Sequence, residues 1–136
     1  MNPILRNVLA VVGGVIIGSL VNMAILIIGS YIIPVPEGMD MMNAESIKEH
    51  MHLFQFKHFV FPFLAHALGT LVGAFVAAKF GVVKPLQLAI LVGVFFLAGG
   101  IANIKMIPSP VWFTVVDVVL AYIPMAWIGY TLAKRS

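Results

Sequence analysis

His66 and Asp117 are ionisable residues inside segments of sequence that are otherwise almost entirely apolar. An imidazole next to a carboxylate can hold or relay a proton, because imidazole titrates near neutral pH and the carboxylate biases its tautomer. A charged carboxylate at the centre of a membrane helix costs about 2.5–3.5 kcal/mol, so Asp117 should be neutral, hydrated or paired. We expect it to pair with His66, either as a proton-sensitive or ligand-binding site or as a structural hydrogen bond between helices.

Further polar side chains accompany this pair within the apolar segments. A rise of about 1.5 Å per residue places His66 and Asp117 about 9–11 Å below the outer membrane boundary. Asn103 lies about 6 Å below the same boundary and Asn22 about 16 Å. We expect His66, Asn103 and Asp117 to meet in the outer third of the molecule. The candidate intramembrane polar site comprises His66, Asp117, Asn103, Asn22 and Thr70.

Other reactive chemistry is sparse. The chain has no cysteine, which excludes disulfides, thiolate metal sites and thiol catalysis. Methionine and histidine gather between residues 39 and 58 and are ligands that suit copper, but His50 and His52 are not spaced to share a metal on one helical face. We predict no metal and no cofactor. An enzymatic role remains only as acid–base chemistry at His66 and Asp117, and a non-enzymatic role is favoured.

The elements that position these side chains are four long apolar segments. Of 136 residues, 62% are hydrophobic and 10% charged, which excludes a water-soluble monomer. Segments long enough to span a bilayer cover residues 7–33, 59–80, 85–107 and 111–133, with an outer loop at 34–58. Backbone polar groups in hydrocarbon need partners within their own segment, so each is a helix. We predict an all-α integral membrane protein: one transmembrane domain, residues 1–136, folded as an up-and-down four-helix bundle.

Small residues mark the faces where these helices are expected to touch, because they let backbones approach closely in lipid. The polar side chains share these faces, which should orient them into the bundle. Pro124 should kink the last helix because it removes a backbone donor. Leftover small residues, such as Gly69 with Gly73 or Gly129 with Ala133, offer contacts to a homo-oligomer or a membrane protein partner. The expected packing residues are Gly14, Gly18, Gly69, Gly73, Gly93, Gly99, Gly100 and Pro124.

The outer loop contains a short amphipathic segment. Ser46 and Glu49 have the spacing of a helix capping box. Ile47, Met51 and Phe54 follow on one helical face. We predict a short helix here, either lying on the outer membrane surface or packed over the mouth of the bundle.

Lys and Arg residues orient the four spans. An even number of spans places both termini on one side of the membrane. Five basic residues fall on that side and three on the other, so the positive-inside rule predicts cytoplasmic termini. The basic residues form no continuous face, which argues against nucleic acid as a partner. They are Arg6, Lys79, Lys84, Lys134 and Arg135 on the first side, and Lys48, Lys57 and Lys105 on the second.

Four segments carry a resemblance: residues 34–38 (PVPEG), 51–54 (MHLF), 63–74 (FLAHALGTLVGA) and 108–117 (PSPVWFTVVD). Through them the chain resembles, over most of its length, a group of small four-span bacterial membrane proteins that have no assigned function. The resemblance implies a multi-pass protein of the cytoplasmic (inner) membrane of a bacterium. It implies no substrate and no catalytic residue.

The sequence therefore favours a membrane helix bundle that binds or scaffolds a partner or lipid through its outer loop. The alternative is a small proton-linked transporter or channel component in which the His, Asp and Asn side chains of the polar site line the route.

Overall fold

The computed structural model describes residues 1–136 and is entirely helical, which confirms the predicted fold class. Four helical segments are long and apolar enough to cross a membrane, at Pro3–Ile32, Phe56–Phe80, Pro85–Met106 and Val111–Arg135. The elements in chain order are α1 (Pro3–Ile32), α2 (Ala44–His50), the 3-10 turns η1 (Met51–Leu53) and η2 (Phe56–Phe59), α3 (Val60–Phe80), α4 (Pro85–Met106), α5 (Val111–Leu120) and α6 (Ile123–Arg135).

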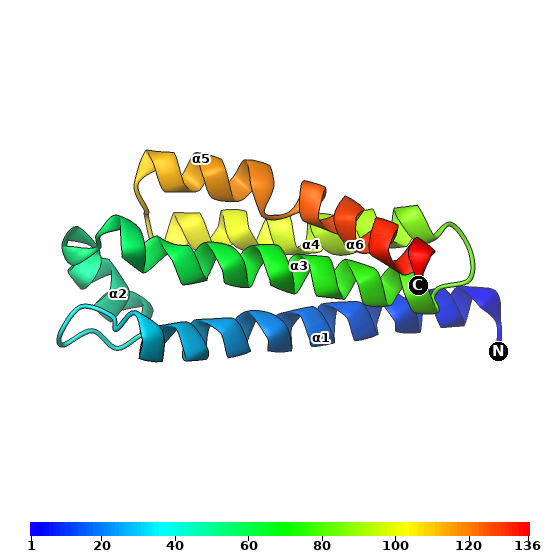
Figure 1. Cartoon of the computed structure of the whole chain (residues 1–136), viewed down its shortest axis with the longest axis horizontal. Coiled ribbons are helices and arrows are strands. Elements are labelled where there is room, and N and C mark those ends of the chain that lie inside the picture. Colours follow the sequence, from blue (N-terminus) through cyan, green and yellow to red (C-terminus); the bar gives the residue numbers. More distant parts are fainter.

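The long helices run up and down, so both termini lie at the same end of the molecule (Figure 1). We call this end, which includes residues 81–84, the terminal end. The opposite end, with residues 33–59 and 107–110, is the loop end. Helix α3 is central and packs against α1, α4 and α6, whereas α1 packs mainly on α3 and only slightly on α4. Helix α3 is therefore the element against which the other long helices pack.

Two glycine pairs hold α1 close to α3. A Cβ added at Gly18 would lie 2.6 Å from the carbonyl oxygen of Gly69, and one added at Gly73 would lie 2.7 Å from that of Gly14. Any side chain at these positions would push the backbones apart, so glycine is needed for this approach. Four of the predicted packing glycines thus form one antiparallel interface within the chain.

Of the predicted packing glycines in α4, Gly93 and Gly100 contact other elements and Gly99 does not. Gly93 lies against Ala126 of α6, where an added Cβ would be 2.7 Å from the alanine Cβ. Gly100 lies against the Tyr122 side chain. Gly99 was wrongly assigned to packing, because it is exposed and an added Cβ would meet nothing within 4 Å.

The small residues offered above as contacts between protomers are used inside this chain. Gly69 and Gly73 face α1, and a Cβ at Gly129 would meet the carbonyl oxygen of Leu71 in α3. Ala133 belongs to the buried core formed by α3, α4 and α6. These stripes are therefore not available to a second copy of the chain.

The last span is two helices rather than one kinked helix. Helix α5 ends at Leu120 and α6 begins at Ile123, with Ala121 and Tyr122 between them. Pro124 has no N–H to donate to the carbonyl of Leu120, so the helical ladder is interrupted at this point. The expected kink is instead a break, and it gives Tyr122 a direction that a continuous helix would not.

The loop helix begins one turn earlier than the predicted capping box. Asn43 caps α2, since its Oδ1 accepts from the backbone N–H groups of Glu45 at 3.0 Å and Ser46 at 3.3 Å. The Ser46 hydroxyl instead accepts from the N–H of Asp40 at 2.8 Å. The capping box at Ser46 and Glu49 is therefore wrong, because Asn43 already satisfies the first N–H groups of the helix.

Candidate functional site: a polar network beneath the loop-end cavity

His66 and Asp117 meet between two helices at the loop end. His66 lies in the second turn of α3 and Asp117 in the second turn of α5. His66 Nδ1 lies 2.8 Å from Asp117 Oδ1, at hydrogen-bond and ion-pair distance. Asp117 is 3% exposed, whereas the His66 side chain is 22% exposed. The carboxylate is thus enclosed, and the imidazole lies between it and the space outside.

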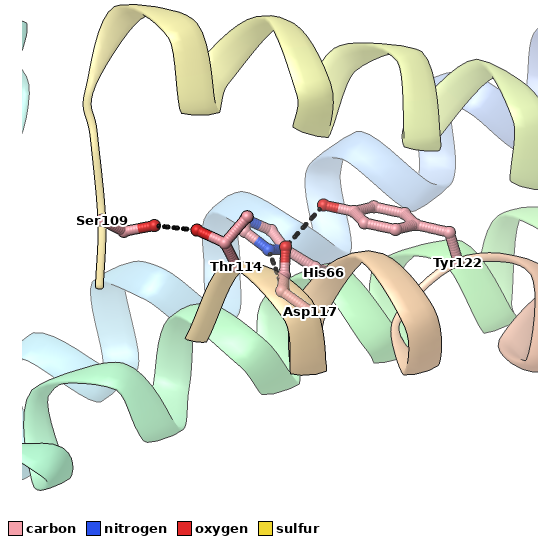
Figure 2. A network of polar contacts seen from close by, with 5 residues as sticks. All are labelled: His66, Ser109, Thr114, Asp117 and Tyr122. Atoms are coloured by element: carbon pink, nitrogen blue, oxygen red, sulfur yellow. Dashed lines mark hydrogen bonds and ion pairs between the residues drawn. The ribbon is translucent and has the colours of Figure 1, made fainter. Parts of the chain in front are cut away.

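Tyr122 completes the network from the break between α5 and α6. Its hydroxyl donates to Asp117 Oδ2 at 3.0 Å, and its ring stacks on the His66 ring with centroids 5.9 Å apart (Figure 2). The two carboxylate oxygens therefore each have one partner. The buried carboxylate is compensated by hydrogen bonds from two different elements, as a charge in an apolar interior requires.

Sequence analysis missed Tyr122. It follows Asp117 by five positions, and residues at that spacing do not share a helical face. Only the break before α6 turns its ring back toward the carboxylate. The available signal was Pro124 close behind, together with Gly100 on α4, which leaves the space that the tyrosine hydroxyl occupies.

The remaining predicted site residues lie outside this network. Asn103 is exposed and makes no side-chain hydrogen bond, so it does not join the network, although it lines the same cavity as His66 and Asp117. Asn22 packs against Gly69 at the α1–α3 interface, where its Cβ is 3.1 Å from the position of an added glycine Cβ. Thr70 is 1% exposed, and its hydroxyl has no hydrogen-bond partner.

A second polar contact fixes the start of α5. The hydroxyls of Ser109 and Thr114 are 2.9 Å apart, linking the loop after α4 to the first turn of α5 (Figure 2). Thr114 lies one turn before Asp117 on the same helix. This contact holds the helix that carries the carboxylate against the end of α4.

A cavity of about 400 Å³ lies at the loop end, and its lining includes both His66 and Asp117. Ligand pockets in proteins range from about 300 to 1,000 Å³. The walls come from α1, α3, α4, α5 and the loop that carries α2, and 16 of the 26 lining residues are hydrophobic. Its polar lining residues are Ser30, Lys57, His58, His66, Asn103, Ser109 and Asp117.

Loop residues form much of the cavity wall. Ala44, Ile47 and Met51 of the α2 region line it, so α2 packs over the mouth of the bundle. Phe59 lines the cavity beside Phe113, and the two rings pack at a tilt with centroids 4.7 Å apart. Met42 and Asn103 line the cavity and are exposed, so the space is open at the loop and along α4. The arrangement can admit an apolar molecule and present the imidazoles of His58 and His66 to it.

No three His, Asp or Glu side chains gather in a way that could hold a metal ion.

No protein-family model, no curated protein and no solved structure matches the chain. The fold and its cavity define the class: an all-helical protein with four helices able to span a membrane and a largely apolar pocket at one end.

Proposed function

We propose that this protein binds a lipid-like molecule at the outer face of a membrane, in the cavity that its loop covers. The observation that carries the proposal is the cavity of about 400 Å³ with mostly hydrophobic walls and the His66–Asp117 pair in its lining. Binding sites for small molecules typically combine apolar walls with a few polar groups that fix orientation. Four apolar helices place such a pocket within reach of membrane lipid.

The methionines of the loop support this proposal. Met39, Met41, Met42 and Met51 all line the cavity. Methionine is flexible and polarisable, so it adapts to irregular apolar ligands. The same residues that suggested metal ligands in the sequence thus suit the wall of a lipid pocket.

A matched pair of serine variants in α1 tests the proposal. Ser30 lines the cavity, whereas Ser19 lies on the same helix, is exposed and does not line it. Native mass spectrometry of the protein extracted in mild detergent should detect a bound apolar molecule in the parent and in Ser19→Trp. Ser30→Trp should lose it, because an indole fills part of the pocket. Parent protein without bound molecule, or retention in Ser30→Trp, would overturn the proposal.

We further propose that the protein lies in a bacterial cytoplasmic membrane with both termini in the cytoplasm. The basic residues of the terminal end support this orientation through the positive-inside rule. The chain has no cysteine, so single-cysteine variants report sidedness directly. In intact cells a membrane-impermeant maleimide should label Met42→Cys in the loop and leave Ser136→Cys unlabelled. The reverse pattern would overturn the orientation.

The second candidate function is a small proton-linked transporter or channel component. The observation that favours it is the imidazole–carboxylate pair lining an open cavity. In liposomes, a transporter should show a proton flux that is lost in both Asp117→Asn and His66→Ala while thermal stability is retained. Absence of flux in the parent, with stability lost in both variants, would favour a structural role for the pair.

A further inference from the structure

We propose that the cavity ligand is a neutral amphiphile with a hydroxyl group, and that this hydroxyl hydrogen-bonds to Nε2 of His66. The inference rests on the proposed function and names the ligand class of the same site. It follows from which atoms of the polar network are already occupied, from the sign of the nearby charge and from the walls of the cavity.

The two oxygens of Asp117 determine which imidazole nitrogen is free. An ionised carboxylate only accepts hydrogen bonds. One oxygen accepts from Tyr122 at 3.0 Å and the other faces His66 Nδ1 at 2.8 Å, so with Asp117 ionised the proton of the imidazole lies on Nδ1. The nitrogen left for a ligand is Nε2, on an imidazole that lines the cavity and is 22% exposed at its side chain.

The chemistry of Nε2 selects a hydroxyl. When the imidazole is neutral with its proton on Nδ1, Nε2 accepts a hydrogen bond; when it is protonated, Nε2 donates one. A hydroxyl both donates and accepts, so it matches His66 in either state. A carbonyl matches only the protonated ring. An ether oxygen likewise has no proton to offer the neutral ring.

The charge beneath the imidazole disfavours an anionic head group. Asp117 is buried at 3% exposure and faces the opposite nitrogen of the same ring. With the ring neutral, a second carboxylate or a phosphate would find no donor at Nε2 and would be repelled by an ionised Asp117. An ammonium would find both Asp117 oxygens occupied and would lose its hydration among apolar walls, which is costly. A neutral head group avoids both penalties.

The walls require the rest of the ligand to be apolar. Leu26 and Ile33 of α1 face the cavity together with Ile104 of α4 and Phe54 of the loop. Lys57 is the one lysine or arginine in the lining, and it is exposed. A molecule with its hydroxyl at His66 and its chain toward the loop would hydrogen-bond to the imidazole and contact the apolar walls.

Photolabelling in lipid nanodiscs tests this assignment with three probes. They share one diazirine-bearing alkyl chain and end in a primary alcohol, its methyl ether or a methyl ketone. At alkaline pH, where an imidazole is neutral, the alcohol should label residues of the cavity wall, and the ether about tenfold less, since one hydrogen bond is worth about 1–1.5 kcal/mol. The ketone should resemble the ether. Peptide mapping by mass spectrometry locates and quantifies the label.

The variant His66→Phe removes both ring nitrogens at similar volume, and it should reduce alcohol labelling about tenfold, to the level of the ether. His52→Phe is the matched control and should leave labelling unchanged, because His52 is exposed and does not line the cavity. If His66→Phe does not fold, the alcohol–ether comparison on the parent still decides. Equal cavity labelling by alcohol and ether would overturn this inference and leave the proposed function standing. No cavity labelling by any probe would overturn both.

Discussion

The two ends of the bundle are closed in different ways. At the terminal end, short polar links tie the chain together: Asn7 Oδ1 accepts from Val82 N–H at 2.9 Å, and its Nδ2 donates to the Val83 carbonyl at 3.1 Å. Lys79 Nζ donates to the carbonyl oxygen of Ser136 at 2.8 Å. These bonds satisfy backbone groups of a loop and of a helix C-terminus, which would otherwise lack partners.

The helices beside the terminal end pack through small residues. Ala74, Ala77, Ala89 and Val92 are fully buried there. At the loop end, Phe61 lies on Gly29, Phe59 packs against Phe113, and a cavity remains between the helices. The comparison assigns stability mainly to the half with close backbone contact and ligand binding to the half without it. Each prediction below tests one side of that division.

The largest expected effect is at the close contact of α1 with α3. Gly14→Ala should lower the free energy of unfolding by about 1–3 kcal/mol, because the new Cβ meets the Gly73 carbonyl and the helices must separate. Gly13→Ala is the control, since a Cβ there meets nothing within 4 Å and alanine favours a helix by up to about 1 kcal/mol. Unfolding by SDS in mixed micelles measures both. Equal stability of the two variants would refute the assignment of stability to this half.

A smaller, local effect is expected at the loop end. Asn43→Ala removes the side-chain oxygen that caps α2 and should cost about 1 kcal/mol in the stability of that helix. Glu49→Ala should cost much less, because Glu49 makes no hydrogen bond in the cap. Amide hydrogen exchange of the loop reads out local opening. Greater loss of protection in Glu49→Ala than in Asn43→Ala would restore the capping box predicted from sequence.

The spans were predictable because a bilayer demands length and apolarity, and both are visible in one sequence. Four apolar segments sufficed to predict the order and direction of the helices. The glycine spacing likewise predicted contact faces, since Gly14 and Gly18 stand one turn apart, as do Gly69 and Gly73. The sequence did not reveal which faces would pair. Gly99 and Gly100 are adjacent in α4, yet Gly100 contacts Tyr122 and Gly99 is exposed.

The polar site was only partly predictable, for a related reason. Rise per residue puts His66 and Asp117 at one depth, and the structure joins them by a hydrogen bond. Depth does not give rotation about the bundle axis, so Asn103 was expected in the network and lies outside it. Tyr122 depends on a helix break, and the cavity depends on how a loop folds over distant helices. Both are non-local features that periodicity does not encode.

The smallest expected effect is the contribution of the Tyr122–Asp117 hydrogen bond to the free energy of unfolding. A double-mutant cycle with Tyr122→Phe and Asp117→Ala isolates their hydrogen bond, and polar contacts between membrane helices are typically worth about 0.6 kcal/mol. Tyr130→Phe with Asp117→Ala is the control cycle, and it should be additive because the Tyr130 ring packs against the α3–α4–α6 core rather than the site. A Tyr122–Asp117 coupling of several kcal/mol would mean that the loop end also carries the stability of the fold. A coupling of about 0.6 kcal/mol would instead mean that the hydrogen bond contributes little to the stability of the fold, which agrees with a role for Asp117 in the binding cavity.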